Sequence, residues 1–212
     1  QTVAVFTAPT PTALTEIIVS QSEKVIKTIR IQERAERLRR IRKSSYTKHG
    51  LDEKFGLTLT MPSAYKIFKE NETTSWFQRE TQKGHINLLV TTTPYDEDIV
   101  DEQNLEKIII LHDSIGKAFI PGRLPNSYFI TEKAYEPYIY STTFGKKPAL
   151  EIRGTWEVKG DFMAGPFLQY IINDKPNNRN IVLEGFVFAP STAKRDYVFE
   201  IETVLRSLQE TR

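Results

Sequence analysis

The sequence predicts an α+β fold in which units of antiparallel sheet are covered by helices. The main observation is the order of patterns over residues 151–208, which read as strand, glycine-rich corner, strand, turn, strand and helix. Residues 174–178 have turn chemistry and separate two runs that are rich in β-branched and aromatic residues. We expect these runs to pair antiparallel. Residues 194–208 then place apolar side chains at helical spacing, so this helix is expected to cover the pair.

A repeated pattern is the second reason for this fold class. A strand runs into proline and then into a helix three times, at residues 5–9, 90–94 and 187–190. The pattern predicts a repeat of strand-strand-strand-helix type within one compact body, residues 1–212, with related halves at about 1–137 and 138–212. The alternative is that proline only marks strand ends, because it cannot donate to a sheet ladder. Since the chain starts at Gln1 in strand-like residues, part of the native N-terminal region is expected to be missing.

Local signals predict the other elements. Residues 2–9 read as a strand ending at Pro9, and Thr10 caps a helix that starts at Pro11 and runs to about Ser44. Periodicity then predicts strands at 55–62, 85–94 and 127–132, a short helix or strand within 63–83, and a helix at 105–119 with His112 facing inward.

Composition excludes several functional classes. The net charge is +2, from 29 basic and 27 acidic residues, which is too balanced for the broad positive field of a nucleic-acid-binding protein. The absence of cysteine excludes disulfides, thiolate catalysis and cysteine zinc sites. The three histidines are isolated and no phosphate-binding loop occurs, so we expect neither a metal nor a cofactor.

One stretch of the predicted first helix is strongly basic. Residues 30–43 contain seven cations and two acidic residues. This segment could bind anionic lipid or another polyanion. The alternative is a solvated helix end whose cations complement the helix dipole, and the lack of interleaved aromatic residues favours it.

Carboxylates near the last strands offer the only arrangement that resembles acid–base chemistry. A hydrolase would need two of Glu157, Asp161 and Glu184 to converge. Because side chains alternate along a strand, Arg153 and Glu157 share one face. The simplest interpretation is a cross-strand ion pair of Arg153 with Glu157 or Glu184, with ligand binding and catalysis as alternatives.

Three motifs resemble a known family. They are Arg153-Gly-Thr-Trp-Glu157, Asp161-Phe-Met-Ala-Gly-Pro-Phe167 and Glu184-Gly-Phe-Val-Phe-Ala-Pro190. Together with Ile120-Pro-Gly122, Ser127-Tyr128 and Lys194-Arg195, they resemble an uncharacterised family of Bacteroidetes envelope lipoproteins, domain of unknown function 4837. Thr155, Ala164 and Phe188 depart from the family pattern by small changes of shape. The resemblance extends over most of residues 55–208.

The resemblance implies a lipid-anchored, periplasm-facing protein of the cell envelope, attached to the membrane only through an anchor absent from this chain. It implies no activity or catalytic residue. We therefore expect a non-enzymatic protein that binds another envelope component, an unknown protein or ligand. The candidate binding surface comprises Arg153, Trp156, Glu157, Asp161, Met163, Glu184 and Arg195.

Overall fold

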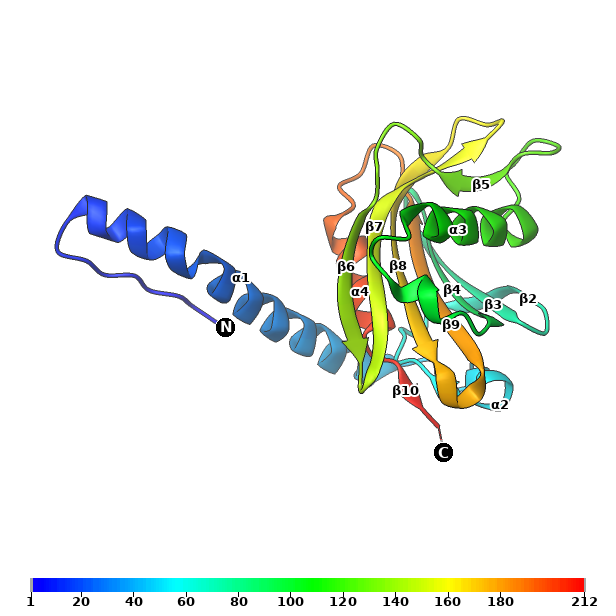
Figure 1. The fold of residues 1–212 in the computed structure, drawn as a ribbon, viewed down its shortest axis with the longest axis horizontal. Helices are drawn as coiled ribbons and strands as arrows, with labels where there is room; N and C mark the ends of the chain where they lie inside the picture. Colours follow the sequence, from blue (N-terminus) through cyan, green and yellow to red (C-terminus); the bar gives the residue numbers. More distant parts are fainter. Residues whose placement is uncertain (1, 212) are drawn as a thin grey trace.

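One antiparallel sheet of eight strands organises the protein (Figure 1). The computed structural model describes residues 2–211. The sheet has the order β2-β3-β4-β9-β8-β7-β5, and β6 also pairs with β7. Its strands are β2 (Lys66–Glu70), β3 (Thr74–Thr81), β4 (Gly84–Pro94), β5 (Tyr128–Thr131), β6 (Tyr138–Phe144), β7 (Lys147–Lys159), β8 (Ala164–Asp174) and β9 (Arg179–Phe188). The predicted α+β class is confirmed.

Within the described residues, four α-helices accompany this sheet. They are α1 (Pro11–Ile41), α2 (Leu51–Phe55), α3 (Leu105–Phe119) and α4 (Arg195–Leu205). Short 3-10 turns occur at Arg42–Ser44, Glu97–Val100 and Lys175–Asn177, and a two-residue strand β1 (Leu57–Thr58) pairs with β10 (Gln209–Glu210). Among residues 2–211, no helix is both long and apolar enough to span a membrane.

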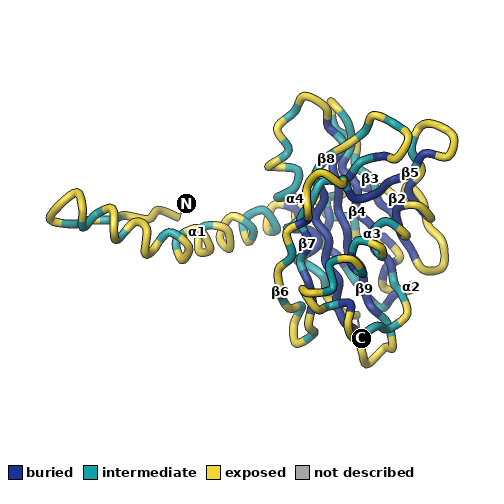
Figure 2. Tube along the Cα trace, turned by 45° about the horizontal axis from the view of Figure 1, so that its top comes forward, coloured by how far each residue is buried: buried dark blue, intermediate teal, exposed yellow. Residues whose placement is uncertain are grey.

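The sheet has an apolar core on each face. On one face, α3 buries Ile108 and Phe119 in a cluster with Trp156 and Phe186. On the other face, apolar residues of α2 and α4 pack on alternate residues of the same strands, with Ile201 of α4 fully buried. Full burial of one large apolar side chain contributes about 1.5–3 kcal/mol, so the two clusters supply most of the driving force for folding. Figure 2 shows this buried interior within a mainly exposed outer layer.

The helix α1 projects from this body (Figures 1 and 2). The predicted start is confirmed, because Thr10 Oγ1 accepts a hydrogen bond from the Ala13 N–H at 3.2 Å and Pro11 is the first helical residue. Of its 31 residues only Ile41 is buried. At 1.5 Å per residue the helix is about 46 Å long. Its predicted apolar face is therefore mostly exposed in this chain.

The prediction of a strand at residues 2–9 is wrong. Residues 2–8 form no strand and run back beside α1 (Figures 1 and 2). A strand needs a partner for its main-chain groups, and α1 holds this segment away from the sheet.

One other expectation needs correction. The strand predicted at 55–62 is mostly absent, because Phe55 ends α2 and only Leu57–Thr58 forms a ladder. Within 63–83 the strand alternative is confirmed, since the chain forms the strands β2 and β3. The strand–proline segments at 90–94 and 187–190 lie at the ends of the adjacent central strands β4 and β9, while the internal repeat stays a prediction.

Candidate binding site

The seven residues of the predicted binding surface lie in four different places. Strand alternation separates the first two, because Arg153 belongs to the α4 face of β7 and Trp156 to its α3 face. Trp156 is 1% exposed and cannot contact a partner as a surface residue, which corrects that expectation. Arg195 begins α4 on the surface, near Glu33 of α1.

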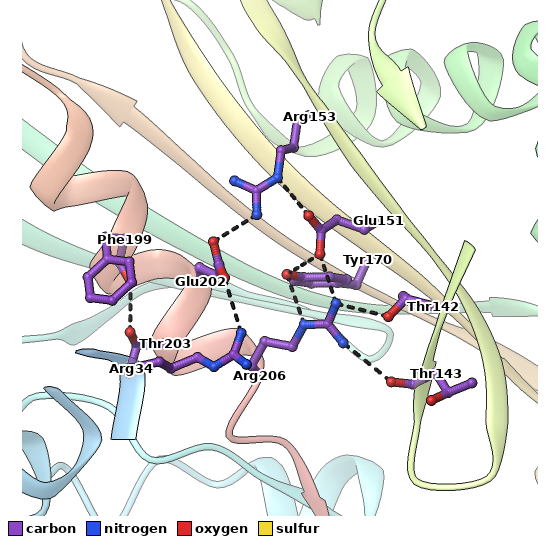
Figure 3. Close-up of polar contacts among 10 residues, drawn as sticks. All are labelled: Arg34, Thr142, Thr143, Glu151, Arg153, Tyr170, Phe199, Glu202, Thr203 and Arg206. Carbon is purple, nitrogen blue, oxygen red and sulfur yellow. Dashed lines mark hydrogen bonds and ion pairs between the residues drawn. The ribbon is translucent and has the colours of Figure 1, made fainter. Parts of the chain in front are cut away.

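Arg153 belongs to an ion network between the sheet and α4 (Figure 3). Its Nε donates to Glu151 Oε1 at 2.6 Å, and its terminal nitrogen donates to Glu202 Oε2 at 2.7 Å. Arg206 donates to Glu151 Oε2 at 2.8 Å and to the Tyr170 hydroxyl at 3.1 Å. The predicted pairing of Arg153 with Glu157 or Glu184 is therefore wrong.

The protonation of this network follows from its geometry. Burial raises the pKa of Glu151, but the guanidinium groups of Arg153 and Arg206 outweigh this effect and hold the pKa below its usual value. Burial, together with the Glu151 carboxylate, raises the pKa of Tyr170. All these side chains already bind one another. The network therefore holds α4 on the sheet and leaves none of these groups without a partner.

The basic segment 30–43 is partly used in the same way. Arg34 donates to Glu202 at 3.1 Å and Arg37 to Glu200 at 2.8 Å, which docks the end of α1 on α4. Two further arginines pair with Glu36 inside α1. Within the described residues, the cations of this segment that have no ion pair are Arg30, Arg42 and Lys43. Fewer cations are thus available for a polyanion than the sequence indicates.

Glu202→Gln is expected to loosen this docking. Glu202 bridges Arg34 and Arg153, and loss of a partly exposed ion pair costs about 1 kcal/mol, or about five-fold in an opening equilibrium. Amide hydrogen exchange over residues 30–41 should accelerate by that factor while the sheet is unchanged. Glu36→Gln is the control, because Glu36 pairs only within α1. Equal acceleration by both variants would contradict a docking role for Glu202.

Glu184 lies in the core, under α3. Its Oε1 lies 3.2 Å from His112 Nε2, and both side chains are at most 2% exposed. Thr131 Oγ1 lies 2.8 Å from His112 Nδ1, and Asp113 accepts from the Thr131 hydroxyl at 2.8 Å. Burial lowers the pKa of His112, but the carboxylates of Glu184 and Asp113 raise it to about 9. The protonated imidazole therefore joins α3 to β9.

The carboxylates proposed for acid–base chemistry do not converge. Glu184 lies on the α3 face, whereas Glu157 follows Trp156 on β7 and takes the opposite face. Asp161 lies at the β7–β8 corner, where Arg123 donates two hydrogen bonds to it, both at 2.8 Å. No two of these residues therefore flank a common site. Among residues 2–211, no three His, Asp or Glu side chains gather in a way that could hold a metal ion.

An aromatic pocket beside this corner brings the remaining predicted residues together. It has a volume of about 200 Å³ and lies on the α3 face, between β2–β4 and the loop after α3. Trp156 and Met163 line it, and Arg123 brings Asp161 to its rim. Its other lining residues are Phe68, Trp76, Gln78, His85, Ile120, Pro121, Gly122, Phe129, Val158 and Phe186.

The pocket is mainly hydrophobic, with few polar groups. The Phe68 and Trp76 rings lie 4.6 Å apart, and Trp156 stacks on Phe129 at 5.2 Å. Trp76 donates to Asn87, whereas the buried Trp156 Nε1 has no hydrogen-bond partner among the described residues. Burial lowers the pKa of His85, which keeps its imidazole neutral at pH 7. These features suit an apolar group.

A family profile described as "Domain of unknown function (DUF4837)" matches residues 44–207. The chain belongs to this family. No curated protein matches it. The DUF4837 chain is also similar to two solved structures. The Ran-binding protein Mog1p of Saccharomyces cerevisiae has 11% identity and a TM-score of 0.45, with 73% of this chain and 90% of that chain covered. A point mutant of the protein Mog1 has 9% identity and a TM-score of 0.42, with 74% and 91% covered. At such values neither likeness extends to function.

Sequence reasoning missed the half of the pocket that β2, β3 and β4 supply in this DUF4837 protein. Trp76 stands out in the sequence among polar residues, but its burial depends on pairing with Leu89 and on contact with Phe186. His85 gives no local signal, because it reaches the pocket only through the β4–β9 register. The motifs that carry the family resemblance did indicate the other half of the pocket.

Proposed function

We propose that this protein is a non-enzymatic, lipid-anchored, periplasm-facing binding protein of the cell envelope, and that its aromatic pocket takes one hydrophobic side chain of a protein partner. The anchor and the location are supported by the family resemblance of the sequence motifs. The absence of a nucleophile motif from the sequence and the separation of Glu157, Asp161 and Glu184 support a non-enzymatic role.

One observation carries the binding role. Each of four segments in the family resemblance contributes a residue to the same pocket: Gly122, Trp156, Met163 and Phe186. Two of these segments are neighbours across the β7–β8 corner, whereas the other two come from the loop after α3 and from β9. Their convergence on one opening, rather than on the ion network around Arg153, favours this pocket as the site.

The size of the pocket favours a side chain over a free metabolite. Sites for drug-sized ligands occupy about 300–1,000 Å³, and this pocket holds about 200 Å³. Exposed apolar residues lie around it, with Phe68 56% and Leu124 52% exposed, and Phe162 projects fully into solvent next to Met163. A pocket that takes one buried side chain and has an apolar rim around it is typical of protein interfaces.

The test uses p-cresol, which has the side chain of tyrosine. Both tryptophans of the chain line the pocket, so their two indole N–H resonances report on its occupancy. We expect saturable shifts of both resonances at millimolar p-cresol, and none with acetate or methylguanidinium. Met163→Lys should weaken p-cresol binding at least ten-fold.

The matched control is Ile110→Lys, because Ile110 is 61% exposed on the outer side of α3. It should leave p-cresol binding unchanged. Absence of p-cresol binding, or equal binding by the Met163 variant, would overturn the pocket assignment. The anchor is tested separately by metabolic palmitate labelling and fractionation of the natural full-length protein, where an unlabelled protein outside the membrane fraction would contradict it.

A further inference from the structure

The strand-like segment 2–9 has no sheet partner among the residues that the structure describes. It reads Thr-Val-Ala-Val-Phe-Thr-Ala-Pro and carries no charged side chain. Val3 is 70% and Val5 80% exposed, while the alternate residues Phe6 and Ala8 are half-buried. An uncharged β-prone segment with exposed branched residues is suited to complete a sheet edge.

The sheet offers an open edge at β2. This strand pairs only with β3 among the described residues, and all five of its residues are exposed. Lysines commonly protect such edges, and β2 also has an irregular register between Ile67 and Lys69. However, Lys69 turns toward α3, where its Nζ donates to the Phe119 carbonyl at 3.1 Å. Ile67, 40% exposed, and Phe68 leave an apolar stretch along this edge.

A hollow lies next to the β2 edge on the α3 face. It has a volume of about 530 Å³ and covers parts of β2 and β3, with the lining residues Ala64, Lys66, Ile67, Phe68, Gln78 and Glu80. Phe68 and Gln78 also line the aromatic pocket, so the two hollows adjoin on the α3 face. A side chain on that face of an added strand would enter the pocket.

The segment of the same chain cannot reach this edge. α1 leaves the body on the side of β6 and α4, whereas β2 forms the opposite side of the molecule in both views (Figures 1 and 2). A helix of about 46 Å holds residues 2–9 at a distance from its own sheet and presents them to a neighbour.

We propose that residues 2–9 of one copy of this chain add as a strand to the β2 edge of a second copy, with Phe6 as the side chain that enters the aromatic pocket. This inference rests on the proposed function of the pocket and names its partner. The contact joins two different surfaces, so it produces a closed ring or an open chain of copies.

The experiment measures the oligomeric state and the binding of a synthetic peptide of residues 2–9. By sedimentation, we expect the mass of the wild-type chain to rise with concentration, whereas a Val3→Asp, Val5→Asp variant should stay monomeric with an unchanged Tm. The peptide should bind this monomeric variant, slow the amide exchange of residues 66–70 and shift both indole resonances. Ile67→Glu should weaken peptide binding at least ten-fold, and Ile110→Glu is the exposed control.

Several results would overturn the inference. One is a wild-type chain that stays monomeric and does not bind the peptide, and another is a Val3, Val5 variant that oligomerises equally. Peptide binding without protection of residues 66–70 would also overturn it. If p-cresol still binds in these cases, the pocket keeps its proposed function and only the strand addition fails. If p-cresol fails as well, both proposals fall.

Discussion

Raising the pH from 6 to 9 is expected to lower the free energy of unfolding by about 3 kcal/mol through His112 alone. The pKa of this imidazole is raised from 6.5 to about 9 in the folded protein. A group whose pKa is raised by folding contributes its full stabilisation at a pH below its pKa in the unfolded chain. This stabilisation is lost as the pH rises through its pKa in the folded protein. A shift of this size corresponds to about 3 kcal/mol. Urea unfolding at pH 6, 7.5 and 9 measures the effect.

The groups that face His112 determine which variants serve as controls for this prediction. The polar groups are Glu184 from β9, Asp113 of the same helix and Thr131 from β5. The rings of Phe129 and Phe167 also pack against the imidazole. His112→Gln should abolish the decline in stability above pH 6.5. Glu184→Gln should cost about 3–5 kcal/mol at pH 7, because it leaves a buried cation without its main partner.

The other histidines act in a different pH range. Burial lowers the pKa of His49 and of His85, so their effect appears below pH 6.5 as stability lost on acidification. A decline above pH 6.5 that persists in His112→Gln would contradict the assignment to His112.

Trp156→Ala is expected to destabilise the protein by about 3–5 kcal/mol. The indole is 1% exposed, stacks on Phe129 and meets the Phe186 ring edge-on at 5.6 Å. Its removal leaves a cavity in the α3-face core. Phe162→Ala, in the adjoining β7–β8 corner, removes an aromatic ring that is fully exposed and should change stability by less than about 0.5 kcal/mol.

Thermal and urea unfolding of the two variants provide the measurement. Similar losses in the free energy of unfolding of both variants would contradict the expectation that burial of the side chain determines the loss.

The expected contrast also determines which variant is suited to a test of the site. A Trp156→Ala protein that fails to bind would report an altered core, so Met163→Lys is the sharper change.

The sequence predicts an element well where two independent signals agree, such as the periodicity of its apolar residues and the element or turn next to it. α3 and α4 combine apolar periodicity with a covered sheet face, and β8 and β9 flank a turn that its residues specify. The segment 2–9 has the same local strand signal but lacks a partner among residues 2–211, and pairing is a tertiary property. Charged residues on β2 left a short helix as an alternative to this strand, since its exposure depends on where the sheet ends.

The site was predictable in part for a similar reason. Strand alternation correctly placed Arg153 and Glu157 on one face, and it also separates Arg153 from Trp156. One partner of Arg153, Glu151, lies two residues away on the same face. The other, Glu202, lies 49 residues away on α4, and no spacing rule relates it to Arg153. His112 was expected inward, but its contact with Glu184 depends on how α3 crosses β9.

The pairing of β1 with β10 makes folding of this chain depend on contacts between segments that lie far apart in the sequence. Leu57 must wait for Glu210, and the central pairing of β4 with β9 joins segments almost a hundred residues apart. Such long-range contacts slow folding. The α4-face core requires residues 200–205, so it stays open until α4 has packed on the sheet. A chain in which α4 has not yet packed therefore has one apolar sheet face uncovered, which makes it a natural substrate for chaperones.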